Sequence, residues 1–288
     1  MKEIKGTDAV SVSRRSFIVG LGAGLCCLGT GAAPVLGEPV LTVVHCGDPQ
    51  LGFGRERPNP YAADLARFEQ TILRINELKP DAVAICGDMV NLWQEQKKDW
   101  PRLLPKIKAP VFAAPGNHDM GGDPIKPKAL KLFNDVYGTD RRSQVVKGWK
   151  FIVANTQYVF PCNKGEAQRE HDAWLKAELA AGKAAGQPMI LVTHVPPYAN
   201  KLNEKDGYFN YPNATRIATL DAYVASGLRF HLAGHLHKTA QRTYKGLPIL
   251  NAETTCNNFD KRPFGFRLLK IYADRRYTWE FIPLVKKA

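Results

Sequence analysis

Short apolar runs that end in polar residues recur along the chain. The runs occupy residues 40–46, 82–86, 110–114, 189–193 and 230–233. Four to seven apolar residues bounded by glycine, proline or a polar residue are typical of buried strands. Each of these runs is therefore predicted to be a strand of a sheet that is covered on both faces.

Other segments carry apolar residues at steps of three and four, which is the period of a helix that covers a sheet. Such spacing predicts helices over residues 65–78, 100–107, 128–137 and 168–179. Glycine-centred hairpins are predicted at Gly148 and Gly246, and two terminal strands over residues 266–272 and 277–284. Strands that alternate with helices indicate an α/β fold. No internal repeat or low-complexity linker interrupts this pattern, so residues 38–288 are expected to form one domain.

Polar side chains with metal-binding chemistry follow the ends of the five predicted strands. They are Asp48 and Gln50, Asp88, Asn117 with His118 and Asp119, His194, and His235 with His237. In open α/β sheets ligands bind at the carboxyl ends of the strands. Carboxylates, imidazoles and amide oxygens at one such edge suit a pair of metal ions.

In this order the residues resemble the calcineurin-like metallophosphoesterase family. The resemblance rests on Gly87-Asp88, on Gly116-Asn117-His118-Asp119 and on Gly234-His235-Leu236-His237, and it runs from about residue 40 to about residue 251. It implies a metallo-dependent phosphatase-like fold. That fold is a four-layer α-β-β-α sandwich, in which two mixed sheets pack face to face with helices outside.

The resemblance also implies a centre of two divalent or trivalent ions, which would be manganese, iron, zinc or magnesium. Asp88 is expected to bridge both ions, because the two oxygens of one carboxylate reach two cations. The other ligands of the first ion are expected to be Asp48, His237 and Gln50. The other ligands of the second ion are expected to be Asn117, His194 and His235.

Gln50 departs from the family pattern, which places Asp-x-His where this chain has Asp48-Pro49-Gln50. An amide oxygen can bind a metal, but it is a poorer ligand for transition metals than an imidazole. The change favours manganese or magnesium at the first position, or a weaker first position. A subset of the family carries glutamine here.

By the same resemblance His118 protonates the leaving oxygen of a phosphate ester, and Asp119 orients the His118 ring. The expected activity is hydrolysis of a phosphorylated substrate, first of all a phosphate monoester. The alternative is a phosphodiesterase or pyrophosphatase acting on nucleotides or lipid headgroups. A lesser alternative is a metal-binding scaffold without activity, for which the Gln50 change is the one argument.

Two interpretations are open for several residues near these motifs. Arg55 and Arg57 follow the first ligand and either clamp a phosphate oxygen or lie on the solvated surface. The long polar segment 199–213 either walls the substrate pocket or is a surface excursion. Among the remaining histidines, His45 and His231 are expected in the core and His171 on the surface.

Residues 1–37 resemble a bacterial twin-arginine (Tat) signal peptide. Arg14 and Arg15 precede a glycine- and alanine-rich apolar stretch. A membrane anchor is the weaker alternative, because five glycines interrupt the stretch. The signal predicts recognition by the Tat export machinery, a periplasmic or secreted protein, and no stable membrane span after cleavage.

Composition agrees with a globular domain, at 44% hydrophobic and 23% charged residues. Removal of residues 1–37 lowers the net charge from +13 to +11. Such a charge attracts phosphorylated substrates or an anionic membrane surface, or it simply keeps the protein soluble. No lysine-rich run with interleaved aromatics is present, so a nucleic-acid partner is not expected. Cys46 and Cys86 are expected to be buried, whereas pairing of Cys162 with Cys256 is left open.

Overall fold

The computed structural model describes residues 37–56 and 58–284. Apart from Gly37, the predicted export signal therefore lies outside the described residues, and so does Arg57. No helix in the described part of the chain is both long and apolar enough to cross a membrane.

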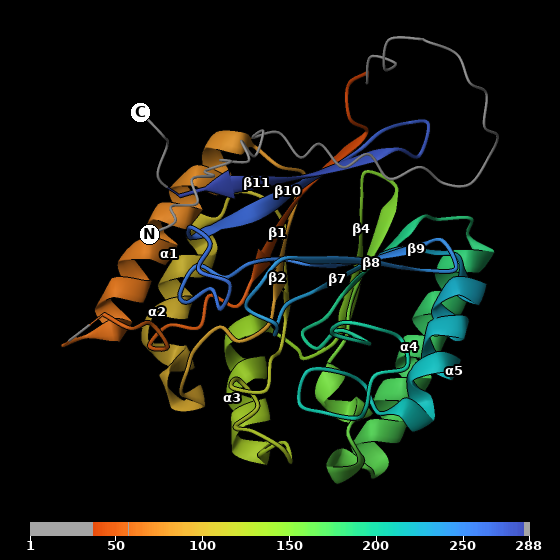
Figure 1. The fold of residues 1–288 in the computed structure, drawn as a ribbon, viewed down its shortest axis with the longest axis horizontal. Helices are drawn as coiled ribbons and strands as arrows, with labels where there is room; N and C mark the ends of the chain where they lie inside the picture. Colours follow the sequence, from red (N-terminus) through yellow and green to blue (C-terminus); the bar gives the residue numbers. More distant parts are fainter. Residues whose placement is uncertain (1–36, 57, 285–288) are drawn as a thin grey trace, which may run out of the picture.

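Two mixed β-sheets form the centre of the fold (Figure 1). The first has the strand order β11-β10-β1-β2-β3, with bounds Tyr277–Pro283, Gly265–Ile271, Leu41–Gly47, Ala82–Cys86 and Val111–Ala114. The second has the order β4-β5-β6-β7-β9-β8, with bounds Arg142–Val146, Trp149–Val153, Met189–Val192, Leu228–Ala233, Leu247–Asn251 and Ala240–Tyr244. Pairing is parallel among β1, β2 and β3 and among β5, β6, β7 and β9, whereas β10, β11, β4 and β8 pair with their neighbours in antiparallel fashion.

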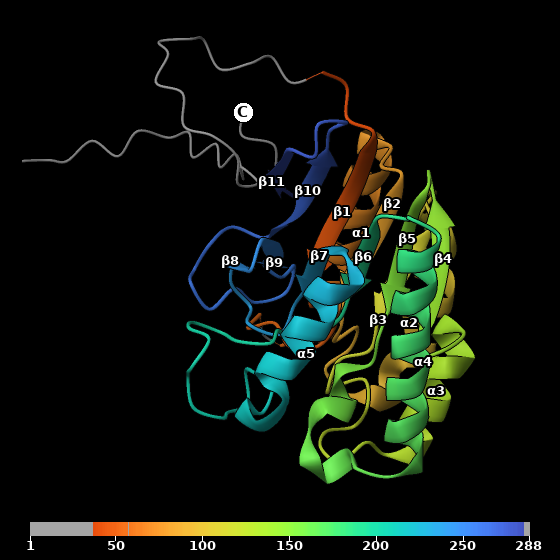
Figure 2. The ribbon, with the colours of Figure 1, turned by 90° about the vertical axis from the view of Figure 1, so that its right-hand side faces the viewer.

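Helices cover the outer faces of both sheets, as Figures 1 and 2 show. Beside the first sheet lie α1 (Pro60–Leu78), α2 (Gln96–Leu103) and α3 (Pro127–Tyr137). Beside the second lie α4 (Glu166–Ala184) and α5 (Asn213–Ser226). Short 3₁₀ helices occupy Trp93–Glu95, Leu104–Lys106, Thr156–Val159 and Pro161–Asn163. The predicted four-layer α-β-β-α sandwich is confirmed, and α5 is the one long helix that the apolar spacing did not predict.

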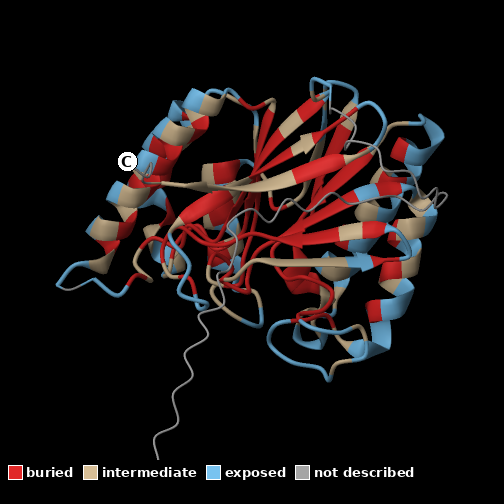
Figure 3. Ribbon diagram, turned by 45° about the horizontal axis from the view of Figure 1, so that its top comes forward, coloured by how far each residue is buried: buried red, intermediate tan, exposed pale blue. Residues whose placement is uncertain are grey.

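Three apolar clusters separate the four layers, and alternation along the strands creates them. In β1, Val44 and Cys46 face the layer of α1 to α3, whereas Leu41 and Val43 face the other sheet. Phe112 of the first sheet stacks on Phe151 of the second, with ring centroids 4.4 Å apart. The third cluster lies between the second sheet and helices α4 and α5. Figure 3 shows the resulting buried strands with exposed residues on the outer helices.

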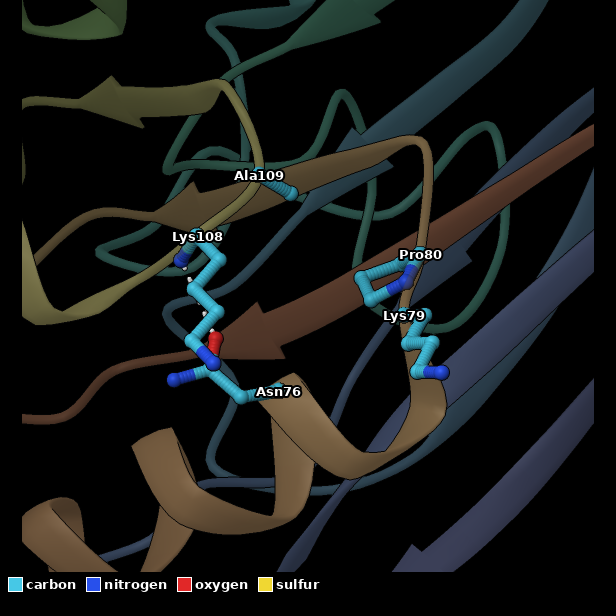
Figure 4. Close-up of a pocket in the computed structure, with 5 residues that line it drawn as sticks. All are labelled: Asn76, Lys79, Pro80, Lys108 and Ala109. Carbon is cyan, nitrogen blue, oxygen red and sulfur yellow. Dashed lines mark hydrogen bonds between the residues drawn. The ribbon is translucent and has the colours of Figure 1, made fainter.

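A small hollow lies where α1 ends and the chain enters β2 and β3 (Figure 4). Its lining residues are Asn76, Lys79, Pro80, Lys108 and Ala109. The Asn76 side chain closes one side: its Nδ2 donates to the Lys106 carbonyl at 2.8 Å, and its Oδ1 accepts from the Lys108 backbone N–H at 3.0 Å. This hollow is at the amino ends of β2 and β3, away from the edge where the chemistry-bearing residues gather.

Candidate metal centre

The carboxyl ends of the parallel strands bring the predicted ligands to one edge of the sandwich. Register places Gly47 of β1 beside Cys86 of β2, and Cys86 beside Ala114 of β3. The chain leaves these strands toward Asp48, Asp88 and Asn117 at the same level. In the second sheet β6 and β7 end just before His194 and His235. All seven predicted ligands are buried: Asp48, Gln50, Asp88, Asn117, His194, His235 and His237.

Four of these side chains converge at what we call the second position. The Nε2 atom of His194 lies 3.1 Å from Asn117 Oδ1, 2.9 Å from His235 Nδ1 and 3.4 Å from Asp88 Oδ2. Ligand atoms of Asp88, His194 and His235 all lie within 4.8 Å of one another. Lone pairs from four groups thus face one point, where a cation would relieve their mutual repulsion.

A second cluster, which we call the first position, lies on the other side of Asp88. Asp48, Asp88 and His237 offer ligand atoms that also lie within 4.8 Å of one another, and His237 Nε2 is 3.6 Å from Asp48 Oδ1. Both oxygens of Asp48 accept the His235 backbone N–H, at 3.0 and 2.9 Å. Asp88 belongs to both positions, which is the sharing expected of a bridging carboxylate.

Backbone carbonyls hold one nitrogen of each ligand histidine. His194 Nδ1 donates to Cys86 O at 2.8 Å, His235 Nε2 to Tyr208 O at 2.8 Å, and His237 Nδ1 to Asn257 O at 2.9 Å. A ring nitrogen that donates to a carbonyl leaves its partner nitrogen as a lone pair. Each lone pair faces the centre, so these tautomers suit metal binding.

The backbone around the ligands is tight and in places strained. Gln50, Asp88, His235 and His237 have positive φ angles of 35°, 46°, 69° and 49°. Residues other than glycine adopt such angles at a cost, and such strained residues recur at functional sites. Gly116 illustrates the close packing, because a Cβ atom there would collide with the carboxylate and backbone of Asp88. The glycine of the Gly-Asn-His-Asp motif therefore makes room for the bridging ligand.

Burial and neighbouring charges have opposite effects on the pKa values of the ligand side chains. Burial raises the pKa of Asp48 to about 8. Burial also favours the neutral form of Asp88, but the charge and hydrogen bond of His194, together with the charges of His118 and His235, outweigh burial and lower the pKa of Asp88. For His194 burial disfavours the charged form, yet the Asp88 and Asp48 carboxylates raise its pKa to about 9. The carboxylates of the site thus favour positive charge at its centre.

The donor set fits two metal ions, and Gln50 supplies the clearest sign. Its side-chain oxygen Oε1 is buried and has no hydrogen-bond partner in the described structure. Its backbone N–H donates to Asp88 O at 2.7 Å, which holds the residue beside the bridging ligand. Buried polar atoms almost always have a partner. A cation at the first position would provide one.

His118 lies beside the shared carboxylate, but Asp119 does not orient its ring. The His118 backbone N–H donates to Asp88 Oδ1 at 2.9 Å, and its Nδ1 donates to the Asn91 carbonyl at 2.8 Å. Asp119 instead accepts backbone N–H groups of Met89 and Gly116, both at 2.9 Å. The orienting role predicted for Asp119 is therefore wrong. Asp119 ties the connection after β2 to the connection after β3.

The sequence did not predict Asn91 as the partner of the His118 ring, because the backbone carbonyl of Asn91 makes the contact. Any residue type could supply that atom, so only the position of the chain reveals it. Burial raises the pKa of Asp119 to about 8, with a further contribution from the Asp88 charge. Asp119 thus lies close enough to the centre for the Asp88 charge to affect its pKa, although its contacts are structural.

The segment 199–213 reaches the centre through Tyr208. Its hydroxyl accepts a hydrogen bond from Asn117 Nδ2 at 2.8 Å, which turns Asn117 Oδ1 toward His194. Its carbonyl accepts from His235, as described above. The segment is therefore a wall of the site, as one of the two readings predicted. Arg55 is exposed and Arg57 is not described, so a phosphate clamp by these residues stays a prediction.

Other predicted residues lie apart from the centre. His45 and His231 are buried, as expected, and bond to Ala233 O and Thr193 Oγ1. The surface location predicted for His171 is wrong, because the ring is buried and accepts the Asn155 N–H at 3.1 Å. Cys46, Cys86 and Cys256 are buried free thiols and Cys162 is an exposed free thiol, so the Cys162–Cys256 pair is not formed.

Comparison with known proteins agrees with this geometry. The family model described as calcineurin-like phosphoesterase matches residues 41–239. The serine/threonine-protein phosphatase CPPED1 of Bos taurus is 30% identical, with coverage of 81% of this chain and 80% of that protein. A 3',5'-cyclic-nucleotide phosphodiesterase of Nostoc is 25% identical, with coverage of 73% and 80%.

Solved structures share the fold. A dimetal phosphatase from Danio rerio aligns over 86% of this chain and 98% of its own, with a TM-score of 0.57 and 14% identity. A purple acid phosphatase from yellow lupin aligns over 86% of this chain and 53% of its own, with a TM-score of 0.55 and 15% identity. With two ligand clusters that share Asp88, this chain belongs to the calcineurin-like phosphoesterase family and is a metal-dependent phosphoric ester hydrolase.

Proposed function

We propose that this chain hydrolyses phosphate monoesters with two metal ions. The observation that carries the proposal is the arrangement at Asp88, which belongs to both ligand clusters and also accepts the His118 backbone N–H. A proton donor thus stands beside the group that would bridge the ions. Similarity supports a monoester, because identity to the bovine protein phosphatase is 30%, against 25% to the Nostoc phosphodiesterase.

Each side chain has a role that its contacts allow. Asp48, His237 and Gln50 would hold one ion, and Asn117, His194 and His235 the other, with Asp88 shared. When bound, the ions supply Lewis acidity that activates water and neutralises charge on the phosphate oxygens. Because His118 Nδ1 donates to the Asn91 carbonyl, its Nε2 is the atom that delivers a proton to the leaving oxygen.

The test compares p-nitrophenyl phosphate with bis-p-nitrophenyl phosphate, using the chain loaded with manganese. We expect faster turnover of the monoester, and a loss of about 100-fold or more in the His118→Asn variant. Asp221→Asn, an exposed carboxylate that pairs with Lys245 on the surface, is the matched control. Preference for the diester would overturn the monoesterase proposal.

A phosphodiesterase is the second candidate. It is favoured by similarity to the Nostoc enzyme and to a cAMP/cGMP dual specificity phosphodiesterase of Mycobacterium tuberculosis, which is 28% identical over 77% of this chain. The same ligands serve both reactions, so substrate preference depends on the walls of the site. Hydrolysis of cyclic nucleotides, measured by product release, would favour this candidate.

We further propose that residues 1–37 direct export by the Tat machinery to the periplasm or the cell exterior. The support is the Arg14-Arg15 pair followed by an apolar stretch rich in glycine and alanine. Tat export carries folded proteins, which suits a centre whose ions are bound in the cytoplasm. Replacement of both arginines by lysine should leave the protein in the cytoplasm of a bacterial host. Equal export of wild type and variant would overturn the proposal.

A further inference from the structure

Exposed aromatic side chains gather at the metal centre. In the described residues three large aromatics are exposed: Tyr208 at 54%, Phe209 at 39% and Phe259 at 47%. All three lie against a ligand histidine, and the half-buried Phe53 joins them. The aromatic surface that the molecule leaves open to water is thus concentrated at one place.

The four rings form two pairs, one beside each metal position. Tyr208 and Phe209 lie 4.5 and 5.2 Å from the His235 ring, which faces the second position. Phe259 stacks on His237 of the first position at 4.5 Å with the planes 13° apart, and Phe53 lies 5.2 Å from the same ring. Phe53 is also 6.2 Å from His118, the proton donor.

Hydrogen bonds to residues of the centre hold three of these four aromatic residues. Tyr208 accepts from Asn117 and His235, as described above. The Phe259 N–H donates to His237 O at 2.9 Å, and the Phe53 N–H donates to Gln50 O at 3.0 Å. Tyr208, Phe259 and Phe53 are therefore fixed by hydrogen bonds to the predicted ligand residues. Open aromatic surface of this kind marks a site that a ligand covers.

We propose that Tyr208, Phe209, Phe53 and Phe259 form a subsite for a flat ring bonded directly to the phosphate oxygen, so that the preferred substrate class is the aryl phosphate monoester. The proposal rests on the monoesterase function proposed above. A ring in this place stacks on other rings or meets their edges, which an alkyl group cannot do. Because the aromatics begin at the ligand histidines, the ring adjoins the phosphate, whereas a nucleotide places its base a sugar away.

The reaction balances without another reactant. The oxygen of water forms a new bond to phosphorus, and the bond between phosphorus and the aryl oxygen breaks. The leaving oxygen takes a proton from His118, one proton of the water stays on the phosphate and the other restores His118, so the products are a phenol and inorganic phosphate. Burial raises the pKa of Tyr208 to about 12, so its hydroxyl remains a neutral part of the wall.

Binding without chemistry gives the first test. Calorimetry on the manganese-loaded protein would compare phenylphosphonate with methylphosphonate, neither of which has an ester bond to hydrolyse. We expect phenylphosphonate to bind about 10-fold more tightly. Phe209→Leu and Phe259→Leu should each lower the ratio of the two affinities about 3-fold. Leu73→Ala, which alters an exposed side chain on α1, is the control.

Turnover gives the second test. Phosphotyrosine and phosphoserine peptides of one sequence would be compared with a nucleoside monophosphate. The two leucine variants should lower the ratio of kcat/KM for phosphotyrosine over phosphoserine, with metal content and thermal midpoint unchanged. Equal affinity for the two phosphonates, or an unchanged ratio in both variants, would overturn the subsite alone. Preference for the nucleotide would also overturn it. If neither phosphonate binds and no monoester is cleaved, the monoesterase proposal fails with it.

Discussion

The two metal positions differ in how completely the protein holds their ligands. At the second position, Tyr208 orients both Asn117 and His235, and the Cys86 carbonyl orients His194. At the first position Asp48 and His237 are held, but Gln50 Oε1 has no partner in the described structure. The second position is thus organised before an ion binds, whereas the first is completed by the ion. We expect the second position to bind more tightly.

The largest effect should come from Asp88, which both positions share. Asp88→Asn removes the negative charge that two cations need, so activity should fall about 1,000-fold or more. Metal content, measured by atomic emission, should fall below one ion per chain. The Asp221→Asn variant should retain two ions. Full metal content in Asp88→Asn would show that the two clusters do not share this ligand.

His118 tests chemistry while leaving both positions intact. His118→Asn should keep two ions but lose about 100- to 1,000-fold in kcat. The loss should grow as the leaving group becomes more basic, because a poor leaving group depends more on protonation. Rates for a series of substituted phenyl phosphates would measure this dependence. A slope identical to that of wild type would exclude His118 as the proton donor.

Tyr208→Phe probes the second position. It removes the hydroxyl that accepts from Asn117 Nδ2 but keeps the ring and the carbonyl that His235 uses. Loss of such an outer contact should weaken the second ion about 10-fold. Stepwise manganese titration by calorimetry would resolve the two affinities. Weakening of the first ion alone would reverse the assignment of Tyr208 to the second position.

Gln50 probes the first position. Gln50→Ala should weaken the first ion by a factor of about 10 or less, because an amide is a modest ligand. Gln50→His should instead favour zinc over manganese there, since an imidazole is the better ligand for zinc. Competition titrations with the two metals would measure both changes. An unchanged first affinity in Gln50→Ala would mean that its oxygen does not bind the ion.

The last effect concerns stability rather than activity or metal binding. Burial lowers the pKa of His231 to about 3, below its usual 6.5, so the unfolded chain binds a proton that the folded chain refuses. Stability from this residue is therefore present above pH 6.5 and is lost as pH falls below that value. At pH 5 the loss is about 2 kcal/mol.

The difference in urea stability between wild type and His231→Gln isolates this effect, because metal binding contributes equally to both proteins. That difference should shrink by about 2 kcal/mol from pH 7 to pH 5. A constant difference over this range would mean that His231 does not titrate on unfolding.

The ligands were predictable because their chemistry is in their side chains and their positions follow from strand ends. The contacts that orient the ligand histidines and His118 could not be predicted, because backbone carbonyls make these contacts. The carbonyls belong to Cys86, Tyr208, Asn257 and Asn91. Residue type carries no signal for such a contact. Asp119 differs from the expectation for the same reason, because its carboxylate accepts the backbone N–H groups of Met89 and Gly116 and does not contact the ring of its sequence neighbour His118.

Two features of the fold also escaped the sequence pattern. Helix α5 buries Arg216 beside Leu220 and Tyr223, so its inner face does not read as an apolar stripe. The Arg216 guanidinium is satisfied by backbone carbonyls of Tyr211, Leu202 and Glu204. His171 lies off the apolar stripe of α4, yet the turn around Asn155 covers it. In both helices, residues distant in sequence bury a polar side chain that the local pattern places at the surface.

The reaction of the four free cysteines of the described structure with a thiol reagent can report local unfolding of the layers in which they lie. Cys46 lies in the cluster under α1 to α3, Cys86 lies between the sheets, and Cys256 contacts the Asp48 carbonyl. All three thiols are buried, so alkylating reagents reach them only when their layer opens, and burial also raises the pKa of each thiol. Exposed Cys162 reacts at once and sets the baseline. Labelling rates with and without metal would therefore tell which layer the ions keep closed.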